Sequence, residues 1–304
     1  MTTPLEQRIQ TSLNAPVDPA VRAFAAQLGE AAEALAVLFY GSNLRTGVLD
    51  GVLDFYVLLP GGIEKGLWPR VSYHEWDAVV DGAGRTLRAK VATMKLATFA
   101  AAASGETLDT TIWARFVQPS ALAWVRDSRQ AEAVVKAVGA AAITAASYAL
   151  ALGPTAGTPD DYWRALFRAT YRAEFRVEKP GRENDILGVN QAHFAGLLPA
   201  ALDAASIAFT CDGDILRPNI NPALRGALRR AWARRARMGK PYNLVRLVRA
   251  STTFDGAAKY AAWKIERHTG VPVALTPWRE RHPVLAAPGV LWRVWRARRR
   301  VGRA

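Results

Sequence analysis

Residues that commonly build metal and redox sites are scarce in this sequence. It has one cysteine, Cys211, and four histidines among its 304 residues. A single thiol excludes an internal disulfide and a cysteine-based zinc site, and the histidines lack the spacing of a zinc site or a catalytic triad. The sequence also lacks a P-loop and a dinucleotide-binding glycine motif. A zinc site, a catalytic triad, a P-loop and a dinucleotide-binding fold are therefore not expected.

Acidic residues are nearly absent from the last third of the chain. From Arg217 to the end there are 21 lysines and arginines but three acids, a formal net charge of +18, whereas the first 216 residues carry −4. A basic segment attached to a near-neutral body predicts a polyanionic partner, either nucleic acid or an anionic membrane. Charge by itself does not distinguish between these two partners.

Long hydrophobic runs are also missing, apart from an uncharged stretch over 137–159 that is mostly alanine and glycine. Because alanine is nearly neutral for membrane insertion, this stretch predicts a buried helix that ends near Gly153 and Pro154. Helices are expected over 19–36, 128–152, 159–177 and 189–204, strands over 36–40 and 51–59, and further strands or a strand–helix pair over 86–99 and 110–118. The expected fold is an α/β domain over 1–120, an all-helical domain over 121–204 that closes a cleft, and a basic helical extension over 205–304.

A phosphate-binding motif is predicted where an apolar strand ends at Gly41 and Ser42. Glycine lets the backbone approach a triphosphate, and the serine hydroxyl with nearby amides can bind its oxygens. A second apolar strand begins at Asp54, after eleven intervening residues, and a carboxylate there can hold Mg²⁺ against the phosphates. This arrangement resembles the nucleotidyltransferase signature, in which two acids stand two residues apart; here Val52 occupies the first position. Asp50 is the alternative second metal ligand, and the competing interpretation of Asp50 is a solvated loop residue.

Four segments in the same order resemble the mitochondrial translocator assembly and maintenance family of phosphatidate cytidylyltransferases. They are Tyr40-Gly41-Ser42 with Val52-Leu53-Asp54, then 113–119, 170–179 and 194–199, and the resemblance covers about residues 33–202. It implies an α/β nucleotidyltransferase domain that transfers CMP from CTP to phosphatidic acid with Mg²⁺, giving CDP-diacylglycerol and pyrophosphate. It also implies a peripheral location on the cytoplasmic face of the inner membrane, or on the matrix side in a mitochondrion.

The resemblance assigns site residues within these segments. Asp54, Arg115, Glu174 and Arg176 would be catalytic, and Gly41, Ser42, Tyr171 and Lys179 would bind the nucleotide. Arg115 is expected on an apolar strand, where a positive side chain is costly without an anion; the alternative is a structural salt bridge. On the helix over 159–177, Arg168, Arg172 and Arg176 form one stripe, which in many proteins is a solvated face.

The C-terminal residues 289–301 combine tryptophan with arginine. On a helix this composition is typical of a segment that lies on an anionic membrane, with Trp292, Arg293, Trp295, Arg296 and Arg299 as the contacts. The rival interpretation is nucleic-acid binding, for which the arginines at 229, 230, 234, 235 and 237 are equally suited. Two alternative functions follow: a nucleotidyltransferase that acts on RNA or a small molecule, and a non-catalytic nucleotidyltransferase-like protein that docks on membranes.

Overall fold

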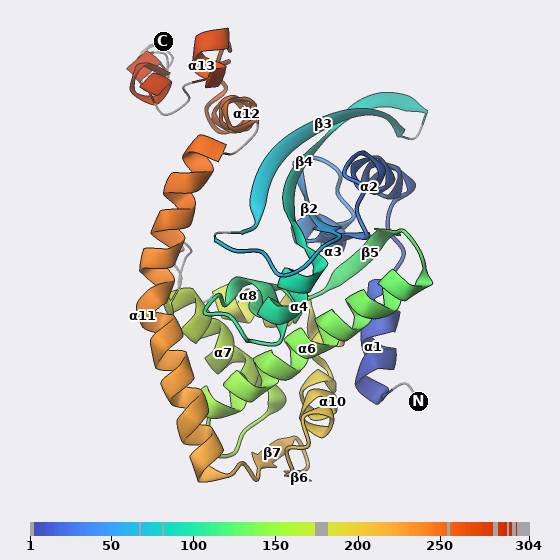
Figure 1. Ribbon diagram of the computed structural model, residues 1–304, viewed down its shortest axis with the longest axis vertical. Helices are drawn as coiled ribbons and strands as arrows, with labels where there is room; N and C mark the ends of the chain where they lie inside the picture. The colour runs from blue at the N-terminus through green and yellow to red at the C-terminus, as the bar shows by residue number, and fades with distance from the viewer. Residues whose placement is uncertain are drawn as a thin grey trace.

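The computed structural model describes residues 3–66, 68–80, 82–173, 182–253, 256–281, 285–290, 292–293 and 296. The chain is a mixed α/β protein, as expected, built around one five-stranded sheet of order β3-β4-β2-β1-β5 (Figure 1). The strands are β1 (Ala36–Tyr40), β2 (Val52–Leu59), β3 (Arg70–Val80), β4 (Ala83–Lys95) and β5 (Ser120–Val125).

The register of the sheet determines which residues meet Asp54. Strand β2 runs antiparallel to β1 and parallel to β4, and this register places Asp54 opposite Tyr40 on one side and Lys90 on the other. Alternate residues of a strand point to opposite faces. Asp54 therefore shares its face with Tyr56, while Leu53 and Phe55 pack on the other face.

Helices cover both faces of this sheet. Helix α2 (Pro19–Ala31) packs on one face, where the Phe24 and Phe55 rings lie 5.7 Å apart. The short helix α3 (Ser42–Thr46) links β1 to β2. Helices α4 (Leu96–Ala103), α5 (Thr111–Phe116) and α6 (Ser128–Leu152) pack toward the other face, and each fully buried aromatic side chain there contributes on the order of 2–3 kcal/mol.

Helix α6 confirms the prediction of a helix over 128–152. Asp127 caps its first turn by accepting a hydrogen bond from the Gln130 amide at 3.0 Å, and Gly153 ends it. The helix is long and apolar enough to cross a membrane, but 67% of its most apolar window is buried inside the protein. It packs against α1 (Pro4–Leu13), a helix that the sequence analysis did not identify.

Two sequence expectations are wrong in detail. Arg115, expected on a strand, lies instead on helix α5 over 111–116, which agrees with the strand–helix alternative for 86–99 and 110–118. At the start of α5, the buried Asp109 accepts a hydrogen bond from the Thr111 amide at 3.0 Å. A short apolar segment that is buried on most sides has no clear periodicity in its hydrophobic pattern. The sequence alone therefore did not distinguish a helix from a strand here. The single helix expected over 189–204 is instead α8 (Arg182–Val189), α9 (Gln191–Phe194) and α10 (Leu197–Ala204).

The basic C-terminal third is mostly helical. After the hairpin of β6 (Phe209–Asp212) and β7 (Ile215–Pro218), the long helix α11 (Pro222–Thr253) runs along the molecule toward β3 (Figure 1). Helix α12 (Ala257–Thr269) and the short α13 (Pro277–Arg281) follow beyond its end. Helix α11 also contributes Trp232 to the main core, where its ring lies 6.3 Å from that of Trp113. The boundaries proposed at 120 and 204 stay predictions.

Candidate functional site

A pocket of about 310 Å³ opens where β1 ends. Its walls come from the turn into α3, the start of β2, helix α5, helix α7 (Pro159–Ala173) and helix α8. The pocket brings together five residues that the sequence analysis selected: Gly41, Ser42, Asp54, Arg115 and Tyr171. Residues 41 and 171 are far apart in the chain, so the shared pocket is a product of the tertiary fold.

Gly41 allows the Asp54 carboxylate to lie against the β1 turn. Gly41 has a φ of 91°, a backbone conformation that favours glycine. A Cβ atom at this position would be 2.9 Å from Asp54 Oδ2, so a larger residue would displace the carboxylate. Ser42 follows on the pocket wall, and its hydroxyl is exposed to a ligand there.

Asp54 is half-buried between two cations. Burial raises the pKa of Asp54 above its ordinary value, while the positive charges of Lys90 and Arg115 act in the opposite direction. Burial likewise lowers the pKa of Lys90, and the Asp54 carboxylate opposes that change. Lys90 was not selected from the sequence, because its position opposite Asp54 depends on strand pairing. The charges of the two side chains therefore stabilise each other beside the pocket.

Arg115 reaches the pocket from helix α5. Its Nη1 donates a hydrogen bond to the Tyr40 hydroxyl at 3.2 Å, and its guanidinium carbon lies 5.0 Å from the centre of the Tyr40 ring. Burial raises the pKa of Tyr40, so this hydroxyl stays neutral at ordinary pH. The contact holds Arg115 with its positive charge facing the pocket that contains Asp54.

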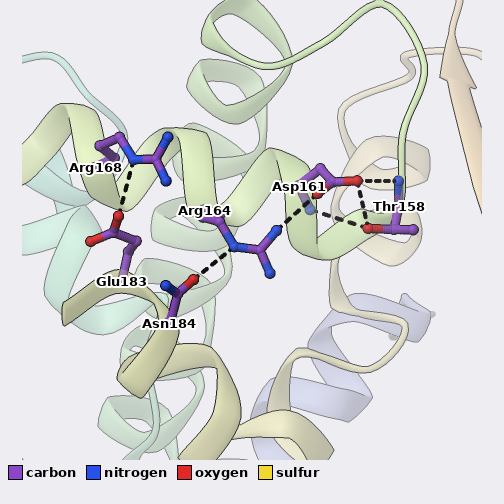
Figure 2. Close-up of polar contacts among 6 residues, drawn as sticks. All are labelled: Thr158, Asp161, Arg164, Arg168, Glu183 and Asn184. Atoms are coloured by element: carbon purple, nitrogen blue, oxygen red, sulfur yellow. Dashed lines mark hydrogen bonds and ion pairs between the residues drawn. The ribbon is translucent and has the colours of Figure 1, made fainter. Parts of the chain in front are cut away.

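Polar contacts between α7 and α8 position the opposite wall (Figure 2). Arg168 Nε lies 3.0 Å from Glu183 Oε1, and Arg164 contacts Asn184 at 2.9 Å and Asp161 at 2.8 Å. Thr158 and Asp161 cap the start of α7 through reciprocal hydrogen bonds. Arg168 of the predicted stripe thus makes a structural ion pair, and α8 is held against α7.

Helix α8 supplies a carboxylate that the sequence analysis missed. Asp185 lines the same pocket as Asp54, and Asn190, directly after the end of α8, lines it too. No local signal marked Asp185, since its relation to Asp54 comes from the packing of α8.

The oxygen ligands of this pocket suit Mg²⁺. Among the described residues no group of three or more histidine, cysteine or acidic side chains is close enough to hold a metal by itself. Mg²⁺ is often bound through one or two carboxylates together with substrate phosphates. Asp54 and Asp185, with the Ser42 hydroxyl nearby, fit that mode of binding.

Several predicted residues are not part of this pocket. Asp50 lies outside it, with a side chain that is 78% exposed and 3.7 Å from Arg85 Nη1, so its alternative interpretation as a loop residue agrees better with its position. Glu174, Arg176 and Lys179 lie outside the described residues.

The predicted membrane contacts are described in part. Trp292 is 55% exposed, and the Arg296 guanidinium lies 5.2 Å from the centre of its ring. Arg293 Nε donates to the Gly289 carbonyl at 3.4 Å. Trp295 and Arg299 lie outside the residues that the structure describes.

Some arginines that were candidates for nucleic-acid binding have internal partners instead. Arg229 Nε donates to the Ala151 carbonyl at 2.8 Å, at the carboxyl end of α6. Arg235 is 7% exposed and donates to the Thr107 carbonyl at 3.0 Å. Positive charge at a helix carboxyl terminus is stabilising, so part of the charge of α11 has a structural role.

Comparison with known proteins found no match to a protein-family model and none to a curated protein.

Proposed function

We propose that this protein is a Mg²⁺-dependent nucleotidyltransferase that transfers CMP from CTP to phosphatidic acid. The observation that supports this proposal is the single pocket lined by Gly41, Ser42, Asp54, Arg115 and Tyr171. The residue types match the chemistry, because a triphosphate needs backbone or hydroxyl donors, cations and a metal-binding carboxylate at one place.

Each residue of the pocket has a proposed role in binding the nucleotide or the metal. Ser42 and the backbone at Gly41 bind triphosphate oxygens, and Asp54 with Asp185 would hold Mg²⁺. The metal, when bound, neutralises negative charge on the phosphates. Arg115 donates hydrogen bonds to phosphate oxygens as charge develops on them.

The transfer itself is an in-line displacement. A phosphate oxygen of phosphatidic acid forms a bond to the α-phosphorus of CTP, and the bond from that phosphorus to the bridging oxygen breaks. Pyrophosphate leaves with the electron pair of that bond. The pocket has to orient the two anionic substrates against each other, which is the task of its cations.

A lipid acceptor is supported by the C-terminal end of the molecule. Trp278, Leu285 and Trp292 are 55%, 69% and 55% exposed, in a part of the chain that is rich in arginine. Exposed tryptophan beside arginine suits docking on an anionic surface. The proposed location, taken from the family resemblance, is the cytoplasmic face of the inner membrane, or the matrix side in a mitochondrion.

The test is CMP transfer from labelled CTP, with Mg²⁺ and phosphatidic acid vesicles. We expect Asp54→Asn to reduce turnover at least about 100-fold, roughly 2.7 kcal/mol of barrier, because a metal-binding charge is lost. Asp214→Asn, in the exposed turn between β6 and β7 and not among the residues that line the pocket, is the matched control and should keep full activity.

The outcome also separates the alternatives. Transfer to RNA or to a soluble alcohol, with none to phosphatidic acid, would retain the pocket and change the acceptor. Absence of transfer to any acceptor, with CTP still bound, would support the non-catalytic alternative. The observation that favours this alternative is that Lys90 lies opposite Asp54 on the neighbouring strand and supplies a positive charge where a metal would otherwise do so.

A further inference from the structure

A second cavity, of about 470 Å³, lies between β4 and helix α12. It shares no lining residue with the pocket around Asp54. The residues that give it its character are Asp50, Gly51, Arg85, Arg88, Trp263 and Arg267. It is thus formed by a loop, a strand and a helix from widely separated parts of the chain.

Packing of α12 on β3 explains how this cavity arises. The Tyr260 ring lies 5.6 Å from the Tyr73 ring, and a Cβ atom on Gly256 would be 2.9 Å from the Tyr73 carbonyl oxygen. The start of α12 is therefore held tightly against the strand. Residues 260, 263, 264 and 267 are neighbours on one helix surface, so this contact also turns Trp263 and Arg267 toward the sheet.

Trp263 holds two guanidinium groups in place. The guanidinium carbon of Arg267 lies 5.2 Å from the centre of its ring, and that of Arg88 lies 5.9 Å away. Cation–π contacts of this kind favour one orientation of a long arginine side chain. The loop before β2 also packs against Arg267. A Cβ atom on Gly51 in this loop would be 3.1 Å from Arg267 Nη1, so the loop lies directly against the guanidinium group.

The acids nearby do not neutralise the cavity. Arg88 Nε lies 3.3 Å from Glu75 Oε1, and Arg85 lies 3.7 Å from the exposed Asp50, a contact that contributes little in water. Arg267 forms no ion pair with any residue in the part of the chain that the structure describes. Net positive charge therefore remains at the cavity, and part of it is on Arg267, whose guanidinium is already oriented by the Trp263 ring.

We propose that this cavity binds a phosphate monoester group. Guanidinium forks match the geometry of phosphate oxygens and bind them in pairs. Arg267 has no ion pair among the described residues, and the exposed Asp50 contact leaves Arg85 able to bind a phosphate oxygen instead. The phosphate can belong to a lipid headgroup, such as that of phosphatidic acid, or to a small soluble phosphate. The proposal concerns binding alone and does not depend on the transfer reaction.

The test is calorimetric titration of the full chain at physiological salt. Dihexanoyl phosphatidic acid, kept below its micelle concentration, and inorganic phosphate are the two probes. Arg267→Gln removes the fork on α12, and we expect it to weaken the binding of at least one probe by about tenfold or more. Arg230→Gln removes an exposed arginine of α11 at the same change in net charge, and should alter binding by less than about twofold.

Three results would overturn the proposal: no binding of either probe, an isotherm unchanged in Arg267→Gln, or equal weakening in both variants. Equal weakening would mean that net charge attracts the ligand. If Arg267→Gln lowers the Tm, the Arg267→Lys variant is measured instead, because lysine keeps the positive charge but lacks the guanidinium fork. Wild-type affinity in Arg267→Lys would then contradict the proposal. Comparable binding of both probes assigns recognition to the phosphate group, and preference for the lipid probe assigns it to a lipid headgroup.

Discussion

At the residue scale, Asp54 combines a proposed metal-binding role with a cost in folding stability. It is half-buried, and burial raises its pKa although Lys90 and Arg115 both favour the charged form. When the pKa is higher in the folded state, the unfolded state releases its proton first as pH rises. Folding stability is then lost between the unfolded pKa, about 3.8, and the higher folded pKa. At neutral pH the ionised carboxylate therefore destabilises the fold.

This leads to a prediction on pH dependence. Asp54→Asn should raise the Tm at pH 7, because the amide carries no charge to desolvate, and should leave it unchanged below pH 3.8. Thermal unfolding of both proteins across this pH range measures the difference, with Asp214→Asn as the exposed control. A lower Tm for Asp54→Asn at pH 7 would mean that its attraction to Lys90 and Arg115 outweighs the cost of burial.

At the scale of elements, helix α11 approaches the end of α7 closely at Gly239. A Cβ atom on Gly239 would lie 2.4 Å from the Ala173 carbonyl oxygen, two residues beyond the pocket residue Tyr171. Such a distance cannot be accommodated without moving one helix. The absence of a side chain at Gly239 thus lets the basic helix support the wall of the site.

Two alanine substitutions on the same helix test this contact. Gly239→Ala should destabilise the protein by about 1–3 kcal/mol, because the helices must separate. Gly226→Ala has only the flexible end of Arg230 nearby, at 3.4 Å, and should be neutral or stabilise by up to about 1 kcal/mol through helix propensity. Urea denaturation measures both. Equal changes in the free energy of unfolding for the two substitutions would show that α11 does not pack closely against α7 at Gly239.

At the scale of the whole molecule, the basic third divides into two parts. On α11, Arg229 and Arg235 bind backbone carbonyls of other elements. Beyond it, α12 and α13 lie at one end of the molecule (Figure 1). Among the described residues of this part, Trp278 and Trp292 are exposed, and so are Arg293 and Arg296. A surface that combines apolar side chains with positive charge suits a membrane interface better than a phosphate backbone alone.

Vesicle binding tests this division. Replacing Trp278 and Trp292 together by alanine should reduce partitioning onto anionic vesicles by roughly tenfold at unchanged net charge, because apolar burial is lost. Leu224→Ala, at an exposed apolar residue on the opposite end of α11, is the control and should bind as wild type. Sedimentation with vesicles is the measurement. Protein that ignores anionic vesicles yet binds RNA tightly at physiological salt would refute the membrane assignment.

What the sequence by itself determined is local. The helix over 128–152, and the strand that ends at Gly41 next to a strand that carries Asp54, were predictable because caps, periodicity and turn residues act within a few positions. The tertiary structure chose the helix over the strand for 111–116. It alone decided that Lys90 and Asp185 border the Asp54 site and that Arg235 has internal partners. These features depend on strand register and on packing between residues distant in the chain, and no local pattern encodes which distant side chain will share a pocket.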